Sequence, residues 1–417
     1  MIINNLQSGK RENRRRVSAM VSWEDRDRPP QELFFETEDT YGEDISCNPH
    51  AFLVASAVAA MHHGEKRIRM EEEVCPQLKD GLITALGWLR HWYGNLSPIT
   101  IEVKTQRISP YHGVPRKAAT FFSGGIDALA SVRWNRLNYP ADHPLSFKDG
   151  ILVYGLEIYK PEAFEYVREN LKILARDANL TLIPVYTNVR YLDADWTFWE
   201  NEFEGAVFAS IAHALVRRFS AVSLASSVSI KDAYPHGSHP LLDPSYSSSD
   251  LQIRHELITL SRYERTQLVA GWDTALQSMR VCNHSEEYQS HLLNCGKCEK
   301  CVRTMLALLA LGSLEDTTAF AKKDLSEKEI SAIKPLNAQV FSYYQELTGP
   351  LSKAGRDDLA GAVQGLIADY YRQAKRENAR KLLIDPIIQF DEKNLGGVLR
   401  KTKRLVSSRG IWTNFRL

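Results

Sequence analysis

The 417-residue sequence predicts an α/β protein centred on a parallel sheet with crossover helices. Strand-like and helix-like segments alternate from residue 118 onward, a glycine-rich loop joins the first such strand to its helix, and four cysteines crowd between residues 282 and 301. Such alternation is typical of βαβ units. We expect three parts: an N-terminal α+β domain (1–115), a parallel-sheet domain that includes the cysteines (116–312), and a C-terminal helical region with a basic tail (313–417).

Composition places the chain among ordinary globular proteins, with 44% apolar and 25% charged residues. Its 52 basic and 51 acidic residues leave a net charge of +1, which gives no overall field for nucleic acid. No apolar run approaches the length of a membrane span, and no signal-type stretch follows the basic cluster of residues 10–16. We therefore expect a cytoplasmic protein that binds neither membranes nor nucleic acid.

The N-terminal part shows a mixture of strand and helix signals. Residues 1 to about 35 are charged and punctuated by prolines, which predicts a strand or an irregular arm. Residues 51–61 are apolar and alanine-rich, residues 66–70 alternate like a strand, and residues 76–93 carry leucines at helical spacing. This pattern indicates a small α+β domain without chemistry of its own.

The central part is predicted to hold four strands, 118–122, 150–154, 181–186 and 221–225, and three helices, 128–137, 161–178 and 199–219. Ligands of open parallel sheets lie at the carboxyl ends of the strands. The segments that follow the strands are therefore the candidate binding residues, among them Leu156 and Ser226. Beyond residue 312 the pattern is helical, with amphipathic segments at 326–347 and 356–383.

The segment Ser123-Gly124-Gly125-Ile126-Asp127 places two glycines between an apolar strand and a helix start. Backbone amides at a helix N-terminus favour an anion, and glycine allows close approach to phosphate oxygens. No Lys-Ser/Thr follows at the spacing of a Walker loop, which argues against a P-loop kinase or GTPase. The alternative is a plain strand-to-helix turn.

Four cysteines, Cys282, Cys295, Cys298 and Cys301, have metal-ligand spacing. Four thiolates suit a tetrahedral Zn²⁺ ion, and the apolar helix directly after the last cysteine favours a structural zinc site. An iron–sulfur cluster remains the alternative. The isolated Cys47 and Cys75 are expected to be small buried residues.

The loop at 123–127 resembles that of the PP-loop ATP pyrophosphatase family, which reads Ser-Gly-Gly-x-Asp-Ser. Ala128 departs from the last position of that motif, where the family has serine. The resemblance implies a fold of the adenine nucleotide α-hydrolase type, with Ser123 to Asp127, Leu156 and Ser226 binding ATP. It also implies that Asp127, a catalytic candidate together with Ser123, holds Mg²⁺ while a substrate oxygen attacks the α-phosphate and releases pyrophosphate.

The loop and the downstream cysteines together resemble the 7-cyano-7-deazaguanine synthase (QueC) family over roughly residues 117–312. The added N- and C-terminal regions resemble the enlarged members found in antiphage clusters of the CBASS and Qat types. The resemblance implies a carbon–nitrogen ligase that adenylates a deazapurine carboxylate and transfers it to ammonia or to a protein amine. The loop at 236–244 lies where the family reads its substrate, which makes Gly237, Ser238, His239 and Asp243 substrate-binding candidates.

Several alternatives stay open. The loop at 236–244 is equally consistent with a connecting loop in which Asp243 caps a turn. The protein as a whole could be a nucleotide-binding regulator with a weakened loop, or a tRNA-modifying PP-loop enzyme, although no cysteine lies near the loop for thiolation. His213 is expected to be a packed histidine, and Glu204 to face either the nucleotide or solvent. A homodimer is compatible with the sequence.

Overall fold

The computed structural model describes residues 1–94, 96–106, 110–111, 113–284, 292–333, 336 and 338–383. The chain divides into two compact units. The first consists of Met1–Leu325 with Lys353–Gly355, and the second contains Ser326–Ser352 and the chain from Arg356 onward. Among the described helices, none combines the length and the apolar character needed to cross a membrane.

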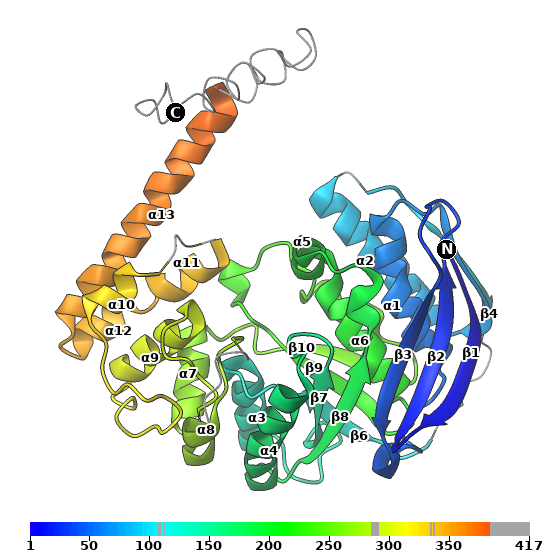
Figure 1. The fold of residues 1–417 in the computed structure, drawn as a ribbon, viewed down its shortest axis with the longest axis horizontal. Coiled ribbons are helices and arrows are strands. Elements are labelled where there is room, and N and C mark those ends of the chain that lie inside the picture. The colour runs from blue at the N-terminus through cyan, green and yellow to red at the C-terminus, as the bar shows by residue number, and fades with distance from the viewer. Residues whose placement is uncertain are drawn as a thin grey trace. The chain divides into compact units, whose positions relative to one another are not determined.

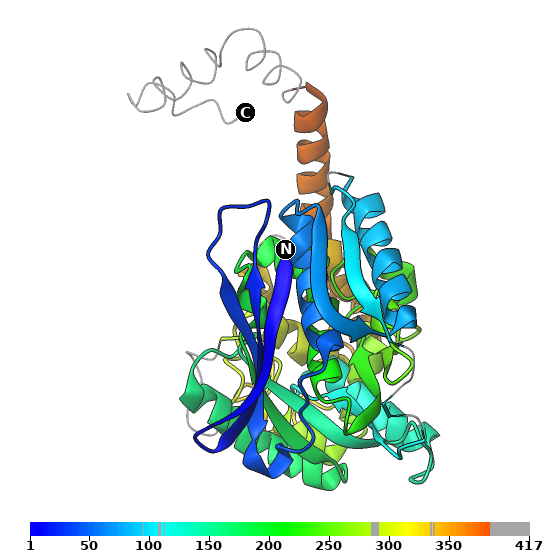
Figure 2. The ribbon, with the colours of Figure 1, turned by 90° about the vertical axis from the view of Figure 1, so that its right-hand side faces the viewer.

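The first unit contains one ten-stranded sheet (Figures 1 and 2). The spatial order of the strands is β10-β9-β6-β7-β8-β3-β2-β1-β4-β5. Their bounds are β1 (Ile2–Arg11), β2 (Arg14–Ser22), β3 (Gln31–Glu38), β4 (Arg67–Val74), β5 (Thr100–Thr105), β6 (Lys117–Phe121), β7 (Phe147–Tyr154), β8 (Thr181–Thr187), β9 (Phe219–Ala225) and β10 (Gln252–Glu256).

The helices of the first unit cover both faces of the sheet. Figure 1 shows α1 beside α6, with α3 and α4 on the other side of the sheet. Their bounds are α1 (Pro49–His62), α2 (Pro76–Tyr93), α3 (Ile126–Asn138), α4 (Pro161–Asp177), α5 (Trp196–Phe198), α6 (Glu204–Ala214), α7 (Arg262–Ala270), α8 (Asp273–Ser278) and α9 (Glu299–Ala310). A π-helical turn at Trp199–Phe203 and short 3₁₀ turns at Asp39–Tyr41, Val189–Leu192, Ile230–Asp232 and Asp243–Tyr246 complete the unit.

The five strands from β6 to β10 form the parallel half of the sheet. Counted from β6 along the chain, their spatial order is 3-2-1-4-5, the order of a doubly wound α/β core. The α/β class and the four strands expected in this region are confirmed, with ends that differ by at most three residues. Buried apolar runs such as Ile151-Leu152 explain why the sequence signal was strong here.

The five N-terminal strands continue the same sheet. β3 pairs antiparallel with β8, where Phe35 lies opposite Thr187 and Thr37 opposite Val185. The Thr37 hydroxyl also donates to the Pro184 carbonyl at 2.8 Å. The boundary drawn at 115/116 therefore separates strands that the structure joins by hydrogen bonds, and both halves belong to one compact unit.

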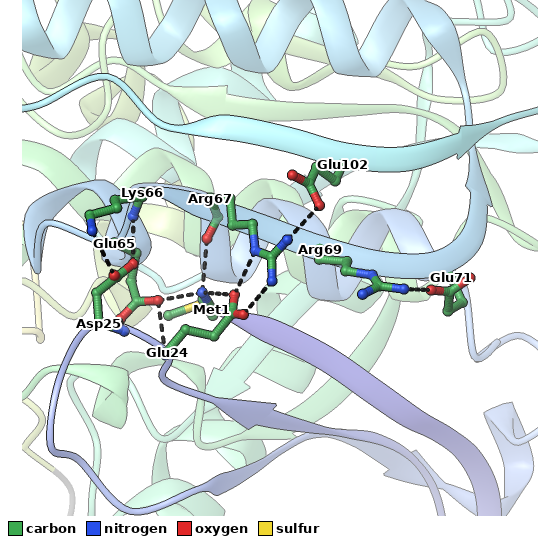
Figure 3. Close-up of polar contacts among 9 residues, drawn as sticks. All are labelled: Met1, Glu24, Asp25, Glu65, Lys66, Arg67, Arg69, Glu71 and Glu102. Atoms are coloured by element: carbon green, nitrogen blue, oxygen red, sulfur yellow. Dashed lines mark hydrogen bonds and ion pairs between the residues drawn. The ribbon is translucent and has the colours of Figure 1, made fainter.

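A polar network ties β1 to β4 (Figure 3). The Met1 α-amino group donates to Glu24 at 3.0 Å, to the Arg67 carbonyl at 2.8 Å and to Glu65. Glu65 is fully buried and also accepts the backbone amides of Glu24 and Asp25, each at 3.0 Å. Its carboxylate is thus satisfied from three directions, as a buried charge requires.

The second unit is helical, but it begins at Ser326, whereas the helical region was predicted to begin at residue 313; residues 313–325 belong to the first unit and form no helix. Its elements are α10 (Glu327–Ser331), α11 (Ala338–Gln345), most of α12 (Thr348–Lys353), and α13 (Asp357–Leu383). A capping box between Ser326 and Glu329 starts α10, and the rings of Phe341 and Tyr370 stack between α11 and α13 at 4.3 Å. The predicted basic tail lies outside the described residues.

Candidate functional site

The glycine loop lies at the point where the strand order of the parallel half reverses, between β6 and β9. β6 ends at Phe121, and α3 begins at Ile126 with Gly125 as N-cap and no side-chain cap. Gly124 has φ of +79°, a conformation that disfavours side chains, and an added Cβ would lie 2.7 Å from Leu171. The first amides of α3 are therefore left to an anion or to solvent.

Three arginines surround this loop. Arg262 and Arg265 both bind the Asp127 carboxylate, the latter at 3.2 Å. Arg280 donates its backbone amide to the Gly124 carbonyl at 2.8 Å. Arginine is the residue best suited to hold phosphate oxygens, so this charge pattern suits an anionic ligand.

The carboxylate of Asp127, predicted to hold magnesium, pairs with two arginines in the structure. One carboxylate oxygen accepts from Arg262 and the other from Arg265. Arg265 is itself fixed, because its side chain is fully buried and also donates to the carbonyls of Val228 and Leu257, at 2.8 and 2.9 Å. Asp127 thus orients two guanidinium groups beside the loop, and its role as a magnesium ligand stays a prediction.

The other nucleotide-binding candidates lie at the same edge of the sheet. Ser123 is exposed, and its hydroxyl accepts weakly from the Gly125 amide at 3.4 Å. Leu156 follows β7, is buried, and its carbonyl accepts from Arg190 at 3.1 Å. Ser226 follows β9, and its hydroxyl donates to the Val228 carbonyl at 2.7 Å. Ser123 is thus the candidate with the most freely available side chain.

The loop at 236–243 is held together by its own residues. Asp243 is fully buried and accepts from the Ser238 hydroxyl at 2.8 Å, from the His255 ring at 2.7 Å and from the His239 amide at 3.3 Å. The Nδ1 atom of His239 accepts from the Leu241 amide. Burial lowers the pKa of His239, which favours its neutral form. These contacts favour the structural alternative for Ser238 and Asp243.

Close backbone packing positions this loop against the start of α6. The Gly205 amide donates to the Gly237 carbonyl at 2.8 Å, and the Gly237 amide donates to the Glu200 carbonyl at 2.7 Å. A Cβ on Gly205 would lie 2.1 Å from Asp243 Oδ1, so only glycine fits there. The π-helical turn at 199–203 precedes this contact, and π-helical turns occur often at functional sites.

Glu204 is a candidate that the sequence left undecided. Its carboxylate lies 3.7 Å from the His236 ring, and Glu157 and Lys300 also act on it electrostatically. Burial raises the pKa of Glu204, with Glu157 adding to the effect and His236 opposing it. Glu157 follows β7, His236 lies in the loop after β9, and Lys300 is on α9. Glu204 thus responds to polar groups from three separate segments.

The four predicted metal ligands come together. The Sγ atoms of Cys282, Cys295, Cys298 and Cys301 all lie within 4.8 Å of one another. The sulfur atoms of Cys295 and Cys301 are 3.9 Å apart, and those of Cys282 and Cys298 are 3.8 Å apart. A tetrahedral zinc ion with bonds of about 2.3 Å places its sulfurs about 3.8 Å apart. The cluster therefore fits a metal ion such as zinc.

Backbone amides donate hydrogen bonds to two of the four cysteine sulfurs. The Cys295 sulfur accepts the Cys298 amide at 3.3 Å, and the Cys282 sulfur accepts the His284 amide at 3.4 Å. Thiolates with such amide bonds are typical of structural metal sites.

Asn294 is a supporting residue that the sequence analysis missed. Its side-chain oxygen accepts the amides of Val281 and Cys282, at 2.8 and 3.2 Å. Its amide nitrogen donates to the carbonyls of Met279 and Ala319, at 2.9 and 3.0 Å. This buried side chain joins the segment that carries Cys282 to the one that carries the other three cysteines. Its position directly before Cys295 was the only sequence signal.

Comparison of the chain with protein-family models, with curated proteins and with solved structures finds no match. The assignment of function therefore depends on the geometry of the site. That geometry combines a glycine loop at the switch point, three arginines beside it, a polar group around Glu204, and a four-cysteine cluster that can hold a metal ion.

Proposed function

We propose that this protein is an ATP-dependent ligase of the PP-loop type, which forms AMP and pyrophosphate. The observation that carries the proposal is the uncapped N-terminus of α3 at the switch point, with Arg262, Arg265 and Arg280 around it. Backbone amides and guanidinium groups stabilise the negative charge that develops on a pyrophosphate leaving group. A kinase-type mechanism is disfavoured by the lack of a Walker lysine.

The roles of the residues follow from their positions. The amides at the start of α3 and the Ser123 hydroxyl would bind phosphate oxygens, and Asp127 would hold Arg262 and Arg265 in place to receive the same charge. ATP supplies an electrophilic α-phosphate and a good leaving group. Asp127 would hold Mg²⁺ if an ion displaced one of its arginine partners, and no step is assigned to that ion.

The substrate that fits best is a carboxylic acid on a purine-like base. Glu204, flanked by His236, can accept hydrogen bonds from the amino and ring N–H groups of such a base. The first acid to test is 7-carboxy-7-deazaguanine, and the acceptor would be ammonia or an amine of a protein, as in antiphage systems. The four-cysteine cluster would hold zinc in a structural role, because cysteines fill all four ligand positions.

One experiment tests the proposal directly. Purified protein would be incubated with ATP, magnesium and candidate acids, and pyrophosphate and AMP would be measured. We expect release that depends on the acid, and we expect Arg262→Ala to lower kcat/KM by about 10–150-fold, as loss of a charge-assisted hydrogen bond of about 1.5–3 kcal/mol implies. Arg176→Ala, an exposed change on α4, serves as the control and should leave the rate unchanged.

A nucleotide-binding regulator is the second candidate. It is favoured by the occupation of both Asp127 oxygens, which leaves the loop able to bind phosphate but without a carboxylate directed at a metal. In that case the protein would bind ATP, and Arg262→Ala would weaken binding, but no acid would elicit pyrophosphate. Calorimetric titration with ATP beside the pyrophosphate assay separates the two candidates.

A further inference from the structure

A second group of metal-type ligands lies away from the cysteines, where α1 ends. One ligand atom from each of His62, His63 and Asp193 lies within 4.8 Å of the other two. The Nε2 atom of His63 is 2.8 Å from Asp193 Oδ2. All three side chains are mostly buried, with 18–30% exposed. These residues belong neither to the glycine loop at 123–127 nor to the cysteine cluster.

Glu202, in the π-helical turn, adds a carboxylate to this group. Its Oε1 atom is 3.0 Å from His62 Nδ1. The Glu202 side chain is 9% exposed, and its buried Oε2 atom has no hydrogen-bond partner among the residues that the structure describes. A buried carboxylate oxygen without a partner is costly, which indicates that a cation or donor completes this site.

The charges around the two histidines are unbalanced. The carboxylates of Glu202, Asp193 and Asp195 act on His62, and Arg28 acts on His63. Among these groups the carboxylates outnumber the arginine, which suits a cation. The guanidinium nitrogen Nη1 of Arg28 is 2.5 Å from His63 Nε2, so this guanidinium group lies where an ion would bind.

We propose that His62, His63, Asp193 and Glu202 form a second metal site, for a divalent transition-metal ion such as Zn²⁺ or Co²⁺. Two imidazoles with carboxylates suit these ions better than they suit Mg²⁺ or Ca²⁺. Ligand atoms around such an ion lie about 3.3 Å apart, so binding requires small side-chain shifts and the displacement of Arg28. An ion here would join the end of α1 to the turn that leads into α6.

Cobalt distinguishes this site from the cysteine cluster. We would titrate the full-length, zinc-loaded protein with Co²⁺ while recording visible and near-ultraviolet absorption. We expect weak visible bands of a nitrogen- and oxygen-bound ion, without the intense near-ultraviolet bands of sulfur-to-cobalt charge transfer. No binding, or charge-transfer bands alone, would show that there is no second site and would overturn the proposal.

Matched variants locate the ion. Asp193→Asn and His63→Ala should each weaken Co²⁺ binding by at least about tenfold. Arg28→Ala should strengthen binding, which no merely destabilising change would do. His91→Ala, an exposed histidine on α2, should leave binding unchanged. Unchanged affinity in Asp193→Asn and Arg28→Ala, with melting curves that show folded protein, would refute the assignment even if His63→Ala fails to fold.

Discussion

In the half of the sheet formed by β3, β2, β1, β4 and β5, charged residues pair with one another, as Arg16 does with Glu36 and Arg67 with Glu24. In the half formed by β6 to β10, charged residues instead gather mainly in the first turns of the helices that follow the strands. Asp127 with Arg262, and Glu204 with His236, are the main examples. Both halves are parts of one sheet and share one apolar core.

The difference follows from strand direction. Parallel strands bring their carboxyl ends to one edge, so loops distant in sequence meet there and can build a ligand site. The antiparallel pair β2–β3 places Arg14 opposite Glu38 and Arg16 opposite Glu36, where opposite charges neutralise each other across the strands. We infer that the buried ion pairs of the N-terminal half mainly support the fold, while the proposed nucleotide site lies on the parallel half.

Among the variants that test this comparison, the largest effect on stability is expected when the cysteine cluster loses its metal. Cys298→Ser should abolish metal binding and soluble yield together, because structural zinc contributes about 10–16 kcal/mol to folding. Cys47→Ser, outside the cluster, should keep both. Metal analysis of the unaltered protein should find zinc in a colourless sample. A brown sample that contains iron and sulfide would show that the cysteines hold an iron–sulfur cluster.

The next effect concerns the N-terminal half. Glu65→Ala should lower the free energy of unfolding by about 3–5 kcal/mol, because it leaves buried donors around Met1 without their acceptor. Glu71→Gln, at an exposed ion pair in the same sheet (Figure 3), should change stability little. Denaturant unfolding measures both. Equal losses of stability in Glu65→Ala and Glu71→Gln would contradict the view that the buried network supports the fold. The folded Glu65→Ala protein should release pyrophosphate at an unchanged rate.

The sequence allowed four of the five strands of the parallel half to be predicted, because these strands are largely buried and separated by helices, whereas β10 was missed. Both properties are local, so β6, β7, β8 and β9 could be located to within a few residues. The pairing of β3 with β8 could not be predicted, because it joins Phe35 to Thr187. A local sequence pattern does not indicate a contact between residues so far apart in the chain. The single ten-stranded sheet was missed for the same reason.

The candidate site shows the same limit. The four cysteines could be grouped because their spacing is short, and the structure confirms that they lie together. The partners of Asp127 were missed, since Arg262 and Arg265 lie more than 130 residues further along the chain. Those partners add a second role for Asp127, the positioning of two arginines, beside its predicted role as a magnesium ligand.

A pH effect tests the junction between the halves, where α1 packs on α6. Burial lowers the pKa of His50 to about 4 and that of His213 to about 3, from 6.5. His213 is fully buried beside the Tyr246 carbonyl at 2.8 Å, as expected for a packed histidine. Between pH 6.5 and 4 the unfolded chain binds more protons than the folded one, so stability should fall as pH falls.

The variant for this effect is His213→Gln, which keeps a donor for the Tyr246 carbonyl but cannot titrate in this range. Unfolding measured from pH 7 to pH 4 should show a shallower loss of stability than in the unaltered protein. His91→Gln, on the exposed surface of α2, should keep the original slope. An unchanged slope in His213→Gln would mean that the buried ring does not contribute to acid sensitivity.

The smallest effect concerns Ala128, where the PP-loop family has serine. Ala128 is 8% exposed in the first turn of α3, between the buried Ile126 and Leu129. A serine hydroxyl placed there would be largely withdrawn from solvent, and without a partner it would cost about 1–3 kcal/mol. We therefore expect Ala128→Ser to lower the melting temperature modestly and to leave ATP affinity unchanged. Calorimetric titration with ATP and magnesium, beside melting curves of both proteins, measures the two quantities. Tighter ATP binding without loss of stability would show instead that position 128 faces the phosphates, and would extend the binding loop by one residue.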